Sequence, residues 1–504
     1  MGDALTELDA RELSDAVRRG ETSATAIVQA HHRAMDRGAD LHAWLCRTDD
    51  AALAHAARID DARDRGGPLG RLAGVPIGLK DLFVTRGIPT TAGSRILSGW
   101  IPPYQGEHAR RVDDADMVLL GKLSLDEFAM GSSNENVVGE PVRNPWARDR
   151  VAGGSSGGAA AAVAAGMIPV ALGSDTGGSI RQPAACCGVV GLKPTYGRVT
   201  RSGMIAFASS LDQAGPITRS VRDAAAVLEI LAGRSDGDST CVDAPVPDFV
   251  AACERGAKGL RIGVHRRSLD ADGLDDDVRA RFLEALALLC DRGATLVDIE
   301  LPHAALGIAT YYVLCAAEAA SNLARYDGVR YGARVAAASV EASIEASRSA
   351  GFGPEVRRRI LLGTFVLRAE SYEAYYGRAA RVRRLVADDH AQAFAHCDVI
   401  ATPTAPQPAF RLGERNADPL AMYLGDIFTV GANLAGLPAI SIPCGFTRPD
   451  RTPRLPIGLQ LVGPAWREDA VLAAAAAHED GSAWHRERPP IAADETSPAS
   501  EPST

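Results

Sequence analysis

The stretch that decides the fold is Gly153-Gly154-Ser155-Ser156-Gly157-Gly158, followed by Gly173-Ser174-Asp175-Thr176-Gly177-Gly178-Ser179-Ile180-Arg181-Gln182-Pro183. Glycine loses more backbone entropy on folding than other residues, so such runs indicate positive φ or close approach of the backbone to another group. We interpret that group as an oxyanion. Ser155 and Ser179 stand in these glycine settings, and Lys80 precedes them in Val75-Pro76-Ile77-Gly78-Leu79-Lys80-Asp81. Two serines and a lysine can carry out acyl transfer without a histidine.

These segments resemble the motifs of the amidase signature family, and the likeness extends from about residue 5 to residue 490. The resemblance implies an α/β fold, the amidase-signature fold, in which helices cover both faces of a central mixed β-sheet. It also implies a catalytic triad. In that triad Ser179 is the nucleophile, Ser155 is a bridging serine held by a cis peptide, and Lys80 is the base.

Residues 179–183, 191–199 and 207–213 look like segments of one subfamily, the glutaminase (A) subunits of tRNA-dependent amidotransferases. This likeness implies that glutamine is hydrolysed and that its ammonia converts Glu-tRNA(Gln) to Gln-tRNA(Gln), Asp-tRNA(Asn) to Asn-tRNA(Asn), or both. The implied partners are the B and C subunits of the amidotransferase, with aminoacyl-tRNA held mainly by the B subunit. ATP and Mg²⁺ are then used by the partner, and this chain needs no cofactor.

The chain is expected to form one amidase-signature domain over residues 1–490. From residue 72, short apolar runs closed by glycine or proline flank the alanine-rich stretch 159–165, an alternation typical of an α/β core. The expected parts follow in chain order: an N-terminal helical layer (1–70), the signature core (71–235), a largely helical insertion (236–395) and the C-terminal part of the core (396–490). The tail 491–504, rich in Ser, Pro and Glu, is expected to be disordered.

Charge and composition narrow the function classes. A formal net charge of −9 argues against direct gripping of a nucleic acid backbone, which needs clustered Lys and Arg. The nine cysteines are scattered without a CxxC pair, so we interpret them as reduced core residues rather than disulfides or metal ligands. The N-terminus lacks a basic start and an apolar run, and no stretch approaches the ~18 apolar residues of a spanning helix. We therefore expect a cytoplasmic protein without membrane contact.

Lys80 can act as a base only when it is neutral. The reference pKa of lysine is about 10.4, and burial among apolar groups lowers it. Pro76, Ile77 and Leu79 would supply such surroundings, with Asp81 pointing elsewhere. For a lysine alone the default interpretation is a surface side chain. The two glycine-serine segments favour the catalytic one.

Two other motifs compete for the first glycine segment. Gly153-x-Ser155-x-Gly157 matches the nucleophile elbow of α/β-hydrolases, but the preceding residues 144–150 are polar instead of a buried strand. A phosphate-binding loop requires a following Gly-Lys-Ser/Thr, which is absent. A flexible turn without chemistry is the remaining alternative.

The loop before Ser179 is a candidate oxyanion hole, because successive backbone N–H groups entering a helix can converge on one oxygen. The candidate donors are Thr176, Gly177 and Gly178. Asp175 and Arg181 bracket the loop, and we expect them to hold its shape by hydrogen bonds rather than to bind substrate.

A free glutamine would need a forked cation for its α-carboxylate and a carboxylate for its α-amine. The resemblance points to Arg359 and Asp426 for these roles. Arg357, Arg358 and Arg359 are consecutive, so the sequence leaves open which of them faces substrate. A solvated helix face is the alternative for all three.

Four places depart from the subfamily pattern: Ala152, Ser124, Ser202 and residues 137–139 (Val-Val-Gly). None removes a member of the triad or a candidate oxyanion donor. They bear on the edge of the pocket and on partner contacts. Two other functions therefore stay open, a free-standing amidase acting on aryl or alkyl amides and a non-catalytic scaffold subunit. We predict no metal site in this chain, because the sequence has no HExxH motif and no His/Cys cluster at ligand spacing.

Overall fold

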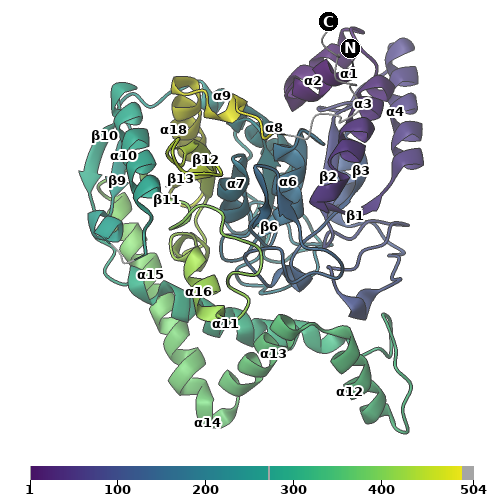
Figure 1. Ribbon diagram of the computed structural model, residues 1–504, viewed down its shortest axis with the longest axis vertical. Coiled ribbons are helices and arrows are strands. Elements are labelled where there is room, and N and C mark those ends of the chain that lie inside the picture. The colour runs from purple at the N-terminus through teal and green to yellow at the C-terminus, as the bar shows by residue number, and fades with distance from the viewer. Residues whose placement is uncertain (1, 271–272, 491–504) are drawn as a thin grey trace, which may run out of the picture.

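The computed structural model of the protein describes residues 2–270 and 273–490 and is built on a mixed sheet of 11 strands (Figure 1). The strand order is β1-β3-β2-β6-β8-β7-β12-β13-β11-β9-β10. The strands are β1 (Trp44–Arg47), β2 (Pro76–Lys80), β3 (Val118–Leu123), β6 (Val170–Asp175), β7 (Val190–Lys193), β8 (Gln213–Thr218), β9 (Arg261–Val264), β10 (Thr295–Asp298), β11 (Val399–Pro403), β12 (Ala439–Phe446) and β13 (Pro456–Val462). A separate ribbon pairs β4 (Arg143–Asn144) with β5 (Ala147–Val151).

The helices fall into an N-terminal group, a group around the sheet and a group below it (Figure 1). The N-terminal and sheet-covering helices are α1 (Gly2–Glu7), α2 (Ala10–Arg18), α3 (Ala24–Arg37), α4 (Asp49–Asp64), α5 (Glu107–Asp114), α6 (Gly157–Ala164), α7 (Arg181–Cys187), α8 (Val221–Leu231), α9 (Phe249–Cys253), α10 (Asp276–Asp291) and α18 (Glu468–Gly481). The others are α11 (Gly307–Asn322), α12 (Val340–Gly351), α13 (Pro354–Val366), α14 (Ala369–Tyr372), α15 (Arg378–Phe394), α16 (Pro419–Tyr423) and α17 (Val430–Leu434).

Both faces of the central strands are covered. Every residue of β2, β6, β8, β12 and β13 is buried. Because successive side chains of a strand point to opposite faces, this burial requires a layer on each face. The helices α6 and α7 pack on each other and on these strands, and α8 and α18 do the same. The α/β fold with a central mixed sheet, expected from the sequence, is confirmed.

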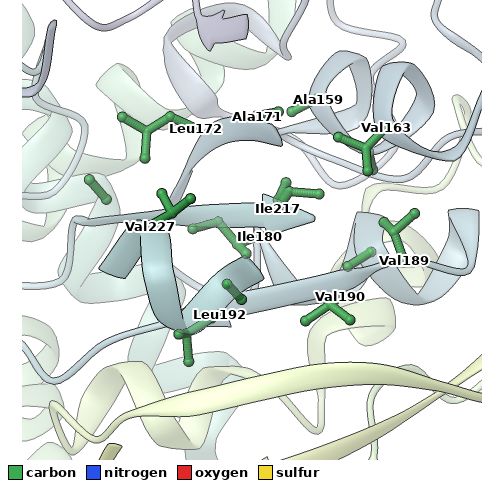
Figure 2. Close-up of a cluster of buried hydrophobic side chains, with 14 of the residues drawn as sticks. Ala159, Val163, Ala171, Leu172, Ile180, Val189, Val190, Leu192, Ile217 and Val227 are labelled. Carbon is green, nitrogen blue, oxygen red and sulfur yellow. The ribbon is translucent and has the colours of Figure 1, made fainter. Parts of the chain in front are cut away.

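The centre of the core is aliphatic. Figure 2 shows side chains from α6, β6, β7, β8 and α8 gathered between the layers, among them Val163, Leu172, Leu192, Ile217 and Val227. Each of these side chains is at most 1% exposed. Alanine, valine and leucine therefore fill the interior, which agrees with the low aromatic content of 5%.

Parallel neighbours bring the glycine segments and Lys80 to one edge of the sheet. In the parallel pair β2 and β6, Leu79 lies opposite Leu172, and in the parallel pair β2 and β3, Lys80 lies opposite Leu123. The carboxyl ends of three strands therefore meet, and the chain leaves β6 directly into the loop that precedes α7, while the loop that precedes α6 follows β5. Ligand sites of α/β sheets lie at such ends.

The N-terminal layer differs from the expectation in one element. Residues 1–70 were expected to be helical, but β1 extends the sheet by pairing antiparallel with β3. The helices around it form as expected, with Asp9 and Ser23 capping α2 and α3. A four-residue strand carries too short an apolar pattern to identify before its pairing partner is known. The predicted disorder of 491–504 falls outside the described residues.

One helical run contradicts the expectation that no stretch approaches spanning length. By length and composition alone, the 22 residues Ala304–Arg325, which include α11, could cross a membrane. Half of the most apolar window is buried inside the protein. α11 packs against α13, α15 and α17, as the core helix of a globular protein does.

Replacing a fully enclosed core side chain should measurably destabilise the sheet. Ile217→Ala should lower the free energy of unfolding by ~2–5 kcal/mol, because it removes apolar contacts and leaves a cavity. Leu361, which is 70% exposed on α13, is the matched control, and Leu361→Ala should change stability by about 0.5 kcal/mol or less. Urea denaturation followed by circular dichroism measures both. Equal effects would contradict the assigned core.

Candidate active site

Lys80 ends β2 with its amine enclosed by serine hydroxyls. The Nζ atom donates to Ser155 Oγ at 2.7 Å, to Ser156 Oγ at 2.9 Å and to Ser174 Oγ at 3.0 Å. Lys80 and Ser155 are completely buried, and the serine oxygens come from the loop before α6 and from β6. The structure thus brings Lys80 and Ser155 together, as the resemblance implies.

Burial lowers the pKa of Lys80 to about 7. The carboxyl groups of Asp126, Asp175 and Asp212 act in the opposite direction, since negative charge favours the ammonium form. Desolvation outweighs them because no carboxylate is hydrogen-bonded to Nζ among the described residues. At neutral pH a substantial fraction of Lys80 is therefore a free amine, which can accept a proton.

The backbone at Gly154 and Ser155 lies very close to Asp126. The Gly154–Ser155 peptide bond is cis, as the resemblance implies. The Ser155 carbonyl accepts the Asp126 N–H at 3.2 Å, and a side chain at Gly154 would overlap the Asp126 carboxylate. Glycine is thus required here by close approach to a buried acid.

Ser179 is the triad candidate with access to solvent. It is 7% exposed, and its carbonyl accepts the Ser156 N–H at 3.1 Å. In the described part of the chain no hydrogen bond joins the Ser179 hydroxyl to that of Ser155. The structure therefore places Ser179 on the accessible side of the Lys80–Ser155 pair, while the assignment of nucleophile and bridge stays a prediction.

The sequence interpretation missed Ser156 and Ser174. Besides accepting from Lys80, Ser156 Oγ donates to the Ser174 carbonyl at 3.1 Å and accepts the Ser174 N–H at 3.3 Å. The hydroxyl of Ser156 thus ties the loop before α6 to β6. Ser156 adjoins Ser155, and Ser174 follows a glycine, but nothing in the sequence said which serines face the amine.

The candidate oxyanion loop is only partly open. The Gly178 N–H donates to Asp175 Oδ1 at 2.9 Å, so in this structure it is committed to the protein. No acceptor in the described ranges takes the N–H groups of Thr176, Gly177 or Ser179. Of the three predicted donors, Thr176 and Gly177 therefore have amides free for a substrate oxygen. The sequence could not reveal that Asp175 folds back under its own loop.

Asp175 and Arg181 hold the shape of this loop, as expected. Arg181 Nε and Nη2 donate to the Asp175 carboxylate at 3.0 and 2.9 Å, and both side chains are fully buried. Burial alone would raise the pKa of Asp175, but the Arg181 guanidinium outweighs it and lowers the pKa to about 2. Thr429 Oγ1 adds a bond to the Gly177 carbonyl at 2.6 Å.

Arg359 is the arginine of the triplet that points inward. It is 3% exposed, whereas Arg357 and Arg358 are exposed on the outer side of α13. Its Nε donates to Glu355 Oε1 at 2.8 Å. Its Cζ lies 5.4 Å from the ring centre of Phe207, 5.0 Å from that of Tyr312 and 5.7 Å from that of Tyr423. Among the described residues nothing accepts from its two terminal nitrogens, so the fork is available for a carboxylate.

Asp426 lies beside the loop that carries Ser179. Its carbonyl accepts from Thr429 Oγ1 at 3.0 Å, the hydroxyl that also binds Gly177, and its Oδ2 accepts from Ser132 Oγ at 2.6 Å. Burial raises the pKa of Asp426 to about 7, while the Ser132 hydrogen bond and the charge of Arg359 act to lower it. A bound ammonium group would hold this carboxylate in its charged form.

Tyrosines connect the Arg359 side to the oxyanion loop. A side chain at Gly177 would come within 2.5 Å of the Tyr311 ring, so Tyr311 packs directly on the loop backbone. Tyr311 and Tyr312 are edge to face at 5.0 Å, and Tyr312 stacks on Tyr423 at 3.8 Å. Tyr312 therefore contacts Arg359 on one side and Tyr311 on the other, and Tyr311 packs on the loop that leads to Ser179.

The departures from the subfamily pattern do not share one location. Ala152 is fully buried, and Ser124 Oγ accepts from Asn134 Nδ2 at 3.3 Å. Ser202 contacts α5 through its carbonyl, which accepts the Glu107 N–H. Val137 and Val138 line a cavity of about 270 Å³ that reaches Glu355. None of the four departures touches Lys80, Ser155 or Ser179 through a hydrogen bond in the described residues.

The family model of Amidase matches residues 26–472. The chain belongs to this family. It is 52% identical to the A subunit of the Glutamyl-tRNA(Gln) amidotransferase of Moorella thermoacetica over 96% of this chain and 98% of the relative. The crystal structure of the protein of the same name from Thermotoga maritima matches with a TM-score of 0.78 at 41% identity, covering 95% of this chain and 96% of that one.

A bacterial aryl acylamidase of the amidase signature family matches with a TM-score of 0.81 at 25% identity, covering 95% of this chain and 97% of that one. The resemblance found in the sequence, both to the family and to the A subunits, is confirmed by these matches. Because the TM-scores are nearly equal, the backbone alone does not separate an amidotransferase subunit from a free-standing amidase. The sequence identity does, at 52% to the A subunit against 25% to the aryl acylamidase.

The lowered pKa of Lys80 predicts a pH-dependent nucleophile. Covalent labelling of Ser179 by a fluorophosphonate should rise as pH increases through about 7, because the fraction of Lys80 in the neutral amine form increases above its pKa. Lys80→Met, of similar length, should abolish most labelling and its pH dependence. Mass spectrometry of the labelled peptide locates the adduct. Labelling on Ser155, or a flat profile between about pH 6 and 8, would contradict the assignment.

Proposed function

We propose that this chain is the glutaminase subunit of a tRNA-dependent amidotransferase. The observation that carries the proposal is that Arg359 faces inward with two terminal nitrogens that have no acceptor among the described residues, while Asp426 and the loop of Ser179 share the Thr429 hydroxyl. An amide substrate with both an α-carboxylate and an α-amine fits this arrangement. The 52% identity to an amidotransferase A subunit over nearly the whole chain supports it.

In the proposed reaction Ser179 Oγ attacks the side-chain amide carbon of glutamine. Its proton passes through the Ser155 hydroxyl to neutral Lys80, and the carbonyl oxygen becomes an oxyanion facing the N–H groups of Thr176 and Gly177. The protonated lysine returns the proton through Ser155 to the leaving nitrogen, so the carbon–nitrogen bond breaks and ammonia departs. Water then attacks the acyl ester with the same proton path and releases glutamate.

Ammonia released here is proposed to serve a partner B subunit, with a C subunit completing a heterotrimer. The B subunit would use ATP and Mg²⁺ to activate Glu-tRNA(Gln) or Asp-tRNA(Asn) and would hold most of the tRNA, in keeping with the charge of −9 on this chain. The steps assigned to this chain need no metal or cofactor. We place the complex in the cytoplasm, where aminoacyl-tRNA is used.

Removing the nucleophile should separate two activities. Ser179→Ala should abolish glutamine-dependent amidation in the complex yet spare amidation with added ammonium, because only ammonia release needs the serine. Ser349→Ala, an exposed serine on α12, is the control. Rates of Gln-tRNA or Asn-tRNA formation from the two nitrogen sources measure the effect. Loss of both activities together would make Ser179 a structural residue.

The head-group contacts separate the glutaminase subunit from the free-standing amidase. Arg359→Ala or Asp426→Ala should raise KM for glutamine about ten- to a hundredfold, since each removes a charge-assisted bond. Hydrolysis of butyramide, which lacks the head group, should change little, and exposed Arg357→Ala is the control. Steady-state kinetics on both substrates measure this. A wild type that prefers butyramide, or two variants with unchanged KM, would favour the amidase.

A further inference from the structure

The loop over residues 126–136, which we call the hub loop, contacts three parts of the candidate site. Asp126 N–H binds the Ser155 carbonyl at 3.2 Å, and Ser132 Oγ binds Asp426 Oδ2 at 2.6 Å. Glu127 Oε2 accepts the N–H of Gly353, the N-cap residue just before α13, at 2.8 Å. One loop therefore joins the serine pair, the amine acceptor and the helix of Arg359.

The hub loop holds a fixed but unfavourable backbone. Phe128, Ala129 and Asn134 have φ of 51°, 61° and 62°, in the left-handed region that L side chains rarely adopt. Packing and internal bonds hold this shape. The Asp126 carboxylate accepts the N–H groups of Asn134 and Asn136 at 2.9 and 3.1 Å. These bonds hold the part of the loop next to Ser155 independently of the Glu127 side chain.

Glu127 is the buried contact between the hub loop and α13. It is 6% exposed, and its second oxygen accepts a short hydrogen bond from Ser94 Oγ. A side chain at Gly353 would overlap Glu127 Oε2, so the helix begins as close to the carboxylate as its backbone allows. Phe128 adds an edge contact to Phe352 at 5.7 Å. The start of α13 is therefore seated on two neighbouring hub-loop residues.

The seat at the start of α13 sets the position of Arg359. Glu355 lies in the first turn of α13, and its Oε1 accepts from both Arg359 Nε at 2.8 Å and Tyr423 Oη at 3.0 Å. A short rigid helix carries Glu355 and Arg359 together, so a shift of its first turn shifts the guanidinium against Asp426. Within the described residues, Glu127 is hydrogen-bonded neither to the reacting groups nor to the free nitrogens of Arg359.

We propose that Glu127 is a positioning residue that seats α13 so that Arg359 can bind the α-carboxylate of an amino-acid substrate. This inference rests on the proposed function. It adds, to the residues proposed to contact substrate, a residue that positions one of them. Glu127 therefore determines specificity for amides with an amino-acid head group and leaves amide cleavage itself unaffected.

The test is steady-state kinetics of the chain, assembled with its co-expressed partner subunits, on glutamine and on butyramide. Glu127→Ala should raise KM for glutamine about tenfold, with kcat and butyramide hydrolysis within about twofold of wild type. Glu127→Gln should restore KM, because its amide oxygen can still accept the Gly353 N–H. Gly353→Ala displaces the same contact from the helix side and should act like Glu127→Ala. Exposed Glu140→Ala, on the following segment, is the matched control.

The experiment distinguishes failure of the positioning role from failure of the proposed function. Glutamine and butyramide activities that fall in parallel in Glu127→Ala and Gly353→Ala, or an unchanged glutamine KM in both, would overturn the positioning role. If Glu127→Ala does not fold, Gly353→Ala and the Gln variant decide. A wild type that prefers butyramide would instead refute the proposed function, and that result is visible before any variant is made.

Discussion

The exclusion of water from the Lys80 amine is the constraint on which the rest of the site depends. An amine on the surface would stay charged at neutral pH, and a serine hydroxyl beside it would gain no base. Full burial lowers the pKa to about 7, and three serine hydroxyls satisfy the nitrogen in place of water. The fully buried strands β2 and β6 provide the dry surroundings.

Burial of the Lys80 amine also explains two constraints on the neighbouring residues, a close backbone approach and the pairing of nearby acids. To bring Ser155 against a buried amine, the chain passes Asp126 so closely that only glycine fits at position 154. The acids nearest the amine are kept from binding it by their own partners: Asp126 accepts backbone N–H groups of the hub loop, and Asp175 is paired with Arg181. A hydrogen-bonded carboxylate on Nζ would favour the ammonium form and remove the base.

The candidate head-group contacts come from other parts of the chain than the lysine and the serines. The groups that suit a charged head group come from α13 and from the turn at Asp426, far along the chain from the glycine segments, and aromatic rings lie between them. Relatives with similar folds carry the names of both an aryl acylamidase and an amidotransferase subunit. Proteins with both names therefore share this backbone fold.

The sequence by itself determined the fold class and the family, and it predicted Lys80, Ser155 and Ser179 as the centre of the site. Local sequence patterns carry these features: glycine runs indicate positive φ or close backbone approach, and short apolar runs indicate buried strands. Strand β1 was not predicted because its four residues are too few to show a strand pattern before their pairing with β3 is known. Only the tertiary structure decided which of three adjacent arginines turns inward, that Ser156 and Ser174 share the amine, and that Gly178 is bound by Asp175. These depend on contacts between segments distant in sequence, where direction and distance are fixed by packing and no local pattern records them.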